Sequence, residues 1–227
     1  MKLSISNVLL FVTVSFICGN IVIAQEKGMK FFEGSWDELM TVAKKAGKPV
    51  FVDVYTTWCV PCKMMSKQIL PLEAVGNKYN ESFINYKMDA ETEEGKLIAE
   101  KYRVNSYPTY LYVKNDGELA HKGGGFHPDP GIFISEADKA LQAIADPYTV
   151  NKMTDDFKSG KRDTAFLKAY ISKLSQLEMD NSEALDTYFM SLSKKEKTQP
   201  ATLAFLGQHV MNVSSKSFAH IMKNIDG

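Results

Sequence analysis

A strand-like segment that leads directly into a pair of cysteines constrains the fold of this chain most. Pro49–Tyr55 is a nearly continuous run of β-branched and aromatic side chains, typical of a strand covered on both faces. The segment Trp58-Cys59-Val60-Pro61-Cys62-Lys63 follows, and a helical pattern begins there. Cys59 is therefore expected at a helix N-terminus, where unpaired backbone N–H groups and the helix dipole favour a thiolate.

The spacing of the two cysteines suits thiol–disulfide exchange. A thiolate at Cys59 attacks a disulfide, and Cys62, one turn later on the same side of the helix, resolves the mixed disulfide. Pro61 fits the first helical turn, where its missing N–H costs nothing.

Three other interpretations of the cysteine pair stay open: a structural disulfide, a zinc site and two inert core thiols. A disulfide that closes so short a loop stabilises little, by about 2 kcal/mol in the loop-entropy model. Zinc lacks partners, because the histidines form no close pair in the sequence; they are His121, His127, His209 and His220. We expect neither a metal nor another cofactor.

The segment Met1–Ala24 has the pattern of a secretory signal peptide: a basic start, an apolar centre and a small-residue exit. Cleavage after Ala24 would remove Cys18 and leave the other two cysteines in an extracytoplasmic, oxidising compartment, which predicts a periplasmic protein. An uncleaved membrane anchor is the alternative. A lipoprotein signal at Cys18 is disfavoured, because Ile17 stands where such a site needs a small residue.

Charge and composition exclude other classes of protein. The 27 basic and 27 acidic residues balance, and no block of Lys and Arg appears, so we expect no nucleic-acid partner. A hydrophobic share of 44% argues against wholesale disorder.

Strand and helix signals alternate from residue 25 to residue 146. The expected strands are 29–32, 49–55, 83–88, 109–113 and 118–122; the expected helices are 35–46, 63–79 with a kink at Pro71, 91–102 and 130–145. Asn115-Asp116-Gly117 predicts a hairpin turn between the last two strands. This order predicts an α/β fold with a mixed central sheet, parallel first and closed by an antiparallel hairpin.

Beyond Asp146-Pro147 the sequence shows helical patterns only. Apolar residues recur at helical spacing in four stretches, which begin at Phe166, Ala184, Leu203 and Phe218. The chain is thus expected to have three parts: a signal peptide (1–24), an α/β domain (25–146) and a small all-α domain (147–227).

Three motifs together resemble the thioredoxin family. They are Val52–Lys63 with its Cys-Val-Pro-Cys pair, Val104–Thr109 and Lys114–Glu118, in the family's order and spacing. The resemblance covers about residues 29–145 and is somewhat stronger to the thioredoxin-like domain of the bacterial transmembrane disulfide reductase than to cytoplasmic thioredoxin. It implies a thioredoxin fold and a redox-active disulfide between Cys59 and Cys62.

The resemblance also implies roles for single residues. Cys59 corresponds to the nucleophile and Cys62 to the resolving thiol. Asp53 corresponds to a buried carboxylate beneath Cys62. Because its strand is apolar, we expect a raised pKa and a role as proton acceptor for the resolving thiol. The alternative is an aspartate with a purely structural role. The residues implied in substrate binding are Trp58, Pro61, Tyr107 and Pro108, the last matching the family's cis-proline. The alternative interpretation of Trp58 is an aromatic side chain of the hydrophobic core with no role at the site.

Two positions depart from the family pattern. The lysine that often pairs with the buried acid corresponds to Asn85, which predicts that Asp53 lacks a cationic partner. Val60-Pro61 replaces Gly-Pro between the cysteines. Because this pair influences the redox potential, the direction of electron flow stays open.

The sequence thus predicts an extracytoplasmic thiol–disulfide oxidoreductase that favours reduction of protein disulfides. Its expected partners are protein or peptide disulfides and an upstream electron donor such as a membrane disulfide reductase. Two alternatives remain: an oxidase or isomerase that runs the exchange in the other direction, and a redox-linked adaptor whose helical domain binds a partner.

Overall fold

A computed structural model describes residues 27–211 and 215–224. The predicted signal peptide and Cys18 lie outside these residues. A mixed four-stranded sheet forms the first part, in the order β2 (Ile84–Asp89), β1 (Val50–Tyr55), β3 (Thr109–Val113), β4 (Leu119–Gly124). The β1–β2 pair is parallel and the β1–β3 and β3–β4 pairs are antiparallel. The predicted mixed sheet with its closing hairpin is confirmed.

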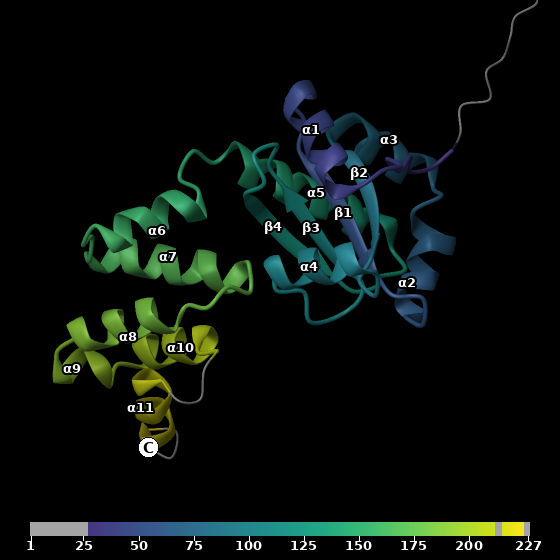
Figure 1. Cartoon of the computed structure of the whole chain (residues 1–227). Coiled ribbons are helices and arrows are strands. Elements are labelled where there is room, and N and C mark those ends of the chain that lie inside the picture. The colour runs from purple at the N-terminus through teal and green to yellow at the C-terminus, as the bar shows by residue number, and fades with distance from the viewer. Residues whose placement is uncertain (1–26, 212–214, 225–227) are drawn as a thin grey trace, which may run out of the picture.

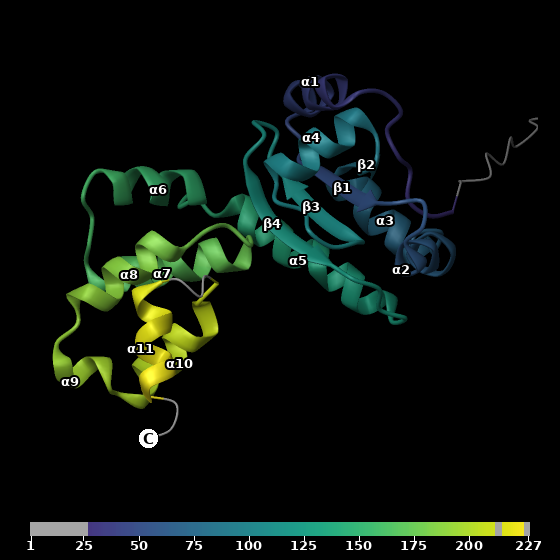
Figure 2. The same cartoon turned by 60° about the horizontal axis from the view of Figure 1, so that its bottom comes forward.

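Helices cover both faces of the sheet (Figures 1 and 2). One face packs against α1 (Trp36–Ala46) and α4 (Glu93–Lys101). The other packs against α2 (Val60–Met64), the π-helix η1 (Met65–Ile69), α3 (Glu73–Ser82) and α5 (Pro130–Ala145). Side chains alternate along β1, so Val52 and Val54 face the α1 side while Phe51 faces the α5 side. Asp53, between the two valines, therefore points toward the α5 side.

Local signals fix the ends of several helices. Ser35 caps α1 in a reciprocal capping box with Glu38, and Gly47 ends the helix in the left-handed conformation at φ 64°. The hairpin turn contains Gly117 at φ 89°, as its Asn-Asp-Gly sequence predicts.

Two predicted elements differ from the structure. The strand expected at 29–32 is a single bridge between Phe31 and Asn85, because Gly28 (φ 101°) and Gly34 (φ 149°) turn the chain away from the sheet on either side. The helix expected over 63–79 begins at Val60, which agrees with the expectation from the cysteine motif that Cys59 lies at its N-terminus. It continues as the π-helix and ends before Pro71, which has no N–H to donate.

Residues 147–227 are called the helical extension below. Its helices are α6 (Val150–Lys158), α7 (Thr164–Gln176), α8 (Ser182–Ser191), α9 (Lys194–Lys197), α10 (Pro200–His209) and α11 (Lys216–Asn224). The extension lies beside the β4 edge of the sheet, on the side away from β2 (Figure 1). None of the helices in the described ranges is both long and apolar enough to cross a membrane.

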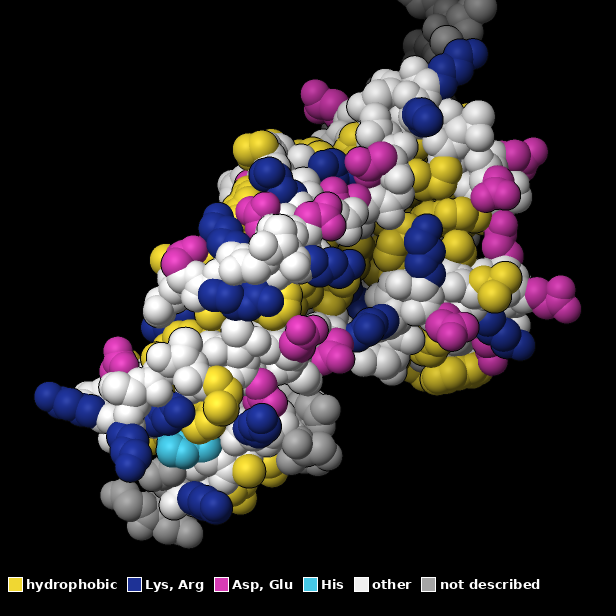
Figure 3. Space-filling view, turned by 60° about the vertical axis from the view of Figure 1, so that its left-hand side comes forward, with side chains coloured by type: hydrophobic (Ala, Val, Ile, Leu, Met, Phe, Trp, Pro, Cys, Tyr) yellow, Lys and Arg dark blue, Asp and Glu magenta, His cyan; other side chains and the backbone are white. Residues whose placement is uncertain are grey.

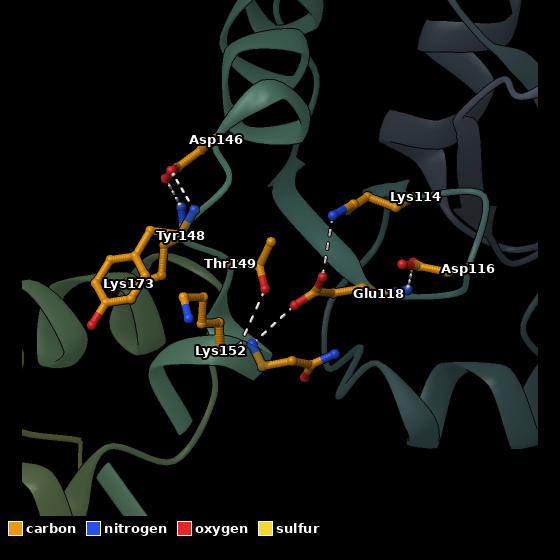
Figure 4. A network of polar contacts seen from close by, with 9 residues as sticks. Lys114, Asp116, Glu118, Asp146, Tyr148, Thr149, Lys152 and Lys173 are labelled. Atoms are coloured by element: carbon orange, nitrogen blue, oxygen red, sulfur yellow. Dashed lines mark hydrogen bonds and ion pairs between the residues drawn. The ribbon is translucent and has the colours of Figure 1, made fainter. Parts of the chain in front are cut away.

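Polar contacts fix the junction between α5 and the extension (Figure 4). Asp146, directly after α5, accepts hydrogen bonds from Tyr148 N (2.9 Å) and from Lys173 Nζ of α7 (3.2 Å). Glu118, in the hairpin, accepts from Asn151 N at the start of α6 (2.9 Å). One cluster of buried apolar side chains runs from the α1 face of the sheet into the extension without a break. The chain thus changes direction at residue 146, whereas its core continues.

The face of the molecule seen in Figure 3 carries basic and acidic side chains intermixed over both the sheet region and the extension.

Candidate active site around Cys59 and Cys62

The two cysteines lie at the start of α2, immediately beyond the end of β1. They form a disulfide with an S–S distance of 2.03 Å and a Cα–Cα distance of 5.3 Å. Cys59 is the N-cap residue, and its Sγ accepts a hydrogen bond from the backbone N–H of Cys62 (3.1 Å). Once the disulfide is reduced, this donor and the positive end of the helix dipole favour a thiolate at Cys59.

Exposed apolar side chains flank the nearly buried disulfide. Cys59 and Cys62 are 3% and 4% exposed, whereas Trp58 and Val60 are 62% and 63% exposed. The rings of Trp58 and Tyr107 pack edge to face, with their centroids 5.9 Å apart. Trp58 is thus a surface residue at the disulfide, and its interpretation as a core aromatic is wrong.

The loop before β3 and the end of β4 lie side by side at this site. The Tyr107–Pro108 peptide bond is cis, the isomer that the resemblance implies. Gly125 N donates to the carbonyl oxygen of Pro108 (2.9 Å), and a Cβ at Gly124 would lie 2.8 Å from the same oxygen. The two segments can approach this closely because Gly124 has no side chain.

Glu91 holds the exposed indole and is a residue that the sequence did not single out. Its carboxylate accepts from Trp58 Nε1 (3.0 Å) and from Thr57 Oγ1 (3.3 Å). Glu91 follows β2, which runs parallel to β1, so the carboxyl ends of the two strands bring it to the cysteines. The available signal was an acidic residue after the neighbouring parallel strand.

Asp53 is almost fully buried, 1% exposed, on the face of β1 that α5 covers. Its carboxylate lies 3.5 Å from Lys87 Nζ. Burial raises the pKa of Asp53 to about 6, and the neighbouring Lys87 charge limits that rise. The Oδ1 atom has no hydrogen-bond partner within the described part of the chain.

The prediction that Asn85 replaces the lysine partner of Asp53 is wrong. In the register of β1 and β2, Asp53 stands opposite Lys87, whereas Asn85 stands opposite Phe51. Asn85 instead donates to Lys30 O (3.1 Å). Residues two apart on a strand point to the same face, so the sequence pattern could not decide which of them meets Asp53.

Lys87 also links Asp53 to the helix that carries the cysteines. Its Nζ donates to Ser66 Oγ (2.7 Å), four residues after Cys62. Asp53, Lys87 and Ser66 thus form a polar chain that ends one helical turn from the resolving thiol. Sequence reasoning missed both Lys87 and Ser66. Among residues 27–211 and 215–224, no group of three or more His, Cys, Asp or Glu could hold a metal ion.

The known proteins that this chain resembles belong to one family. A family model described as a thioredoxin-like domain matches residues 36–141. Thioredoxin H-type of Oryza sativa subsp. indica is 39% identical over 94 residues, covering 41% of this chain and 71% of that protein. Thioredoxin of Echinococcus granulosus is 37% identical over 87 residues, covering 38% of this chain and 76% of that protein.

Other similar proteins are matched in part. Chloroplastic thioredoxin Y of Oryza sativa subsp. japonica is 35% identical over 108 residues, 48% of this chain but only 58% of the relative's length. A solution structure of a candidate disulphide-isomerase from Bacteroides thetaiotaomicron is 35% identical, with a TM-score of 0.47, and covers 52% of this chain and 98% of its own.

Proposed function

The chain belongs to the thioredoxin family, and we propose that this member reduces protein disulfides outside the cytoplasm. The Cys59–Cys62 disulfide within the thioredoxin-like domain makes it a thiol–disulfide oxidoreductase. The reducing direction, the protein substrates and the compartment are parts of the proposal.

In the reducing direction the cysteine pair gives two electrons to the substrate. The Cys59 thiolate attacks one sulfur of the substrate disulfide, and the other substrate sulfur leaves as a thiolate that takes up a proton. Cys62 then loses its proton and attacks Cys59 Sγ. The mixed disulfide breaks, the second substrate thiolate leaves, and the Cys59–Cys62 disulfide forms. An upstream dithiol donor must reduce this disulfide before the next cycle.

The observation that carries the exchange reaction is Asp53. The second step needs a base for the thiol of Cys62, which is buried. Asp53 is also buried, and Lys87 and Ser66 link it to the helix that carries Cys62. Its pKa of about 6 leaves it mostly ionised at neutral pH but still able to accept a proton. In the oxidising direction the same carboxyl group would return a proton to Cys62, so Asp53 serves both directions. The reducing direction is supported by the resemblance of the sequence motifs to a disulfide-reductase domain.

The extracytoplasmic location is supported by the sequence of residues 1–24 alone. The test is expression in a bacterial host with separation of periplasm and cytoplasm, followed by mass determination of the chain. We expect a periplasmic chain that begins at Gln25. A chain that keeps its first residues in the cytoplasmic fraction would contradict this part of the proposal.

The redox potential tests the direction. Equilibration with glutathione should give a reduction potential of about −270 mV, as for reducing thioredoxins. A potential of about −120 mV, typical of a strong oxidant, would overturn the reducing direction in favour of an oxidase.

A trapping experiment tests the substrate class and the roles of the two thiols. Cys62→Ala should accumulate mixed disulfides between Cys59 and protein substrates, and Cys59→Ala is the matched control that should trap none. Equal capture by both variants would contradict the assigned roles.

A further inference from the structure

Lys122 of β4 is a buried cation where the sheet meets the helical extension. Its side chain is 3% exposed, and burial of an ammonium group is costly unless it is paired. Its Nζ lies 2.5 Å from the Glu178 carboxylate and donates to the Arg103 carbonyl oxygen at 2.8 Å. Arg103 follows α4 and Glu178 follows α7, so one ammonium group joins the sheet, the connection before β3 and the extension.

The two partners of Lys122 occupy equivalent positions. Arg103 and Glu178 each come one residue after the C-cap of a helix, with left-handed φ values of 52° and 53°. Val104 N bonds to Ala99 O in the first case, as Met179 N does to Leu174 O in the second, both at 2.8 Å. This is the helix-ending motif in which glycine is usual.

The left-handed conformation is unfavourable for a non-glycine residue, because its Cβ lies too close to the following carbonyl oxygen. Arg103 and Glu178 adopt this conformation, and both accept a hydrogen bond from the Lys122 ammonium group, Arg103 through its carbonyl oxygen and Glu178 through its carboxylate. The C-terminal end of a helix carries partial negative charge, which favours a nearby cation. Lys122 therefore stabilises the ends of α4 and α7 together.

The Arg103 side of this link leads to the cysteine site. Residues 103–108 form the connection that carries the cis Tyr107–Pro108 bond and places the Tyr107 ring against Trp58, the residue before Cys59. Lys122 donates a hydrogen bond to the carbonyl oxygen of Arg103, the first residue of this connection. Two residues after Lys122, β4 reaches Gly124, which lies against the carbonyl oxygen of Pro108. Lys122 is thus connected to both segments that meet at the cis-proline.

We propose that Lys122 is a positioning residue through which the helical extension holds the loop 103–108 in place for substrate binding. Docking of the extension at Glu178 fixes Arg103 through Lys122, and so fixes Tyr107 and Pro108, which face an extended segment of a protein substrate. The inference rests on the proposed function, because it concerns protein disulfides at the same site. The extension then contributes to substrate affinity without contacting the cysteines.

Glu178→Ala in the full chain tests the inference. Insulin reduction gives KM and kcat, and the reaction of the reduced protein with 5,5′-dithiobis(2-nitrobenzoate), a small disulfide, reports the chemistry of Cys59 alone. We expect KM for insulin to rise about fivefold or more, the lower end of typical coupling between sites, with kcat and the small-disulfide rate unchanged. Lys122→Met, which keeps an unbranched side chain but removes the charge, should have the same effect.

Two variants separate positioning from a loss of stability. Glu178→Gln keeps an oxygen acceptor and should recover part of the wild-type KM. Lys173→Ala removes another ion pair of the extension, with Asp146 at 3.2 Å, but does not touch the loop; KM should stay at the wild-type value.

Two outcomes overturn the inference while the proposed function stands. One is an unchanged KM in both Glu178→Ala and Lys122→Met. The other is an equal rise of KM in Lys173→Ala, which would indicate a general effect of loosened packing. Failure of the wild-type protein to reduce insulin would instead overturn the proposed function, and the inference with it.

Discussion

Asp53 lies on the central strand of the sheet, where two opposing effects act on its carboxyl group. Removal from water raises its pKa, and the Lys87 ammonium group at 3.5 Å lowers it. Burial is the larger effect, so the pKa of Asp53 lies at about 6 instead of 3.8. This value has consequences both for the reaction and for stability.

Asp53→Asn should remove a pH-dependent part of the activity. In the wild-type protein, resolution of the mixed disulfide should accelerate as pH rises through about 6, because Asp53 then becomes able to accept the proton of Cys62. Without this base the resolution rate should fall on the order of 100-fold. Single-turnover reduction of insulin over a range of pH measures both effects. Asp37→Asn, on exposed α1, is the control, and an Asp53→Asn profile that still rises near pH 6 would contradict the role.

Asp53→Asn should also stabilise the fold at neutral pH. Because the pKa in the folded state lies above that in the unfolded chain, the folded state binds more protons between about pH 4 and pH 6, and stability falls as pH rises through this window. A difference of about two pKa units corresponds to about 3 kcal/mol. Urea unfolding should show this gain at pH 7 and little at pH 4. An equal gain at both pH values would refute the explanation.

Glu91 should act on substrate affinity through Trp58. Glu91→Ala removes the acceptor of the indole N–H, and an exposed hydrogen bond contributes about 0.5–1 kcal/mol, so KM for a protein disulfide should rise about two- to fivefold. Glu91→Gln keeps an acceptor and should behave nearly as the wild type. Fluorescence anisotropy in a Trp36→Phe background reports Trp58 alone. Unchanged anisotropy in Glu91→Ala would show that the indole is held by other contacts.

At the scale of elements, close backbone approaches decide which helices can tolerate a larger side chain. A Cβ at Gly95, in the first turn of α4, would lie 1.9 Å from Asp89 O at the end of β2. A Cβ at Gly207 of α10 would meet nothing within 4 Å. The two glycines look equivalent in the sequence, since each interrupts a helical pattern.

The same substitution at these two glycines should therefore have opposite effects. Gly95→Ala should destabilise the protein by about 1–3 kcal/mol, because α4 must move away from β2. Gly207→Ala should stabilise it by up to about 1 kcal/mol, because alanine favours a helix interior. Urea unfolding of both variants is the measurement, and destabilisation of equal size at both sites would contradict the argument.

Elements with strong local signals were predictable, and those shaped by neighbours were not. The capping box of Ser35, the β1 segment and the hairpin turn depend on adjacent residues, and each forms where the sequence indicates. The strand expected at 29–32 shrinks to one bridge, and α6, packed through Val150, Met153 and Phe157, was not identified as a separate helix. The glycines at positions 28 and 34 shorten the first element, whereas packing within the shared apolar cluster forms the second.

At the scale of the whole molecule, the sheet and the extension share one continuous apolar cluster. The chain should accordingly unfold as one cooperative unit, although the predicted parts divide at residue 146. Both tryptophans, Trp36 and Trp58, lie in the first part, so their fluorescence reports on that part alone.

Phe157→Ala tests this cooperativity from within the extension. Phe157 is buried in α6, and its truncation should cost about 3–5 kcal/mol. The tryptophan transition and the far-UV circular dichroism transition should shift together to lower urea. Leu97→Ala, at an exposed position of α4, should leave both unchanged. A tryptophan midpoint that stays in place while circular dichroism becomes biphasic would show that the two parts unfold separately.

The sequence by itself determined the order of the elements from β1 to α5, the position of Cys59 and Cys62 at a strand-to-helix turn, and the family. These features depend on residues close together in the chain, so composition and spacing reveal them. Only the tertiary structure decided which residues surround the cysteines. Lys87 rather than Asn85 meets Asp53, Glu91 holds Trp58, and Lys122 joins residues from two distant helix ends. Such pairings depend on strand register and on helix packing, which place residues far apart in sequence within one hydrogen bond of each other.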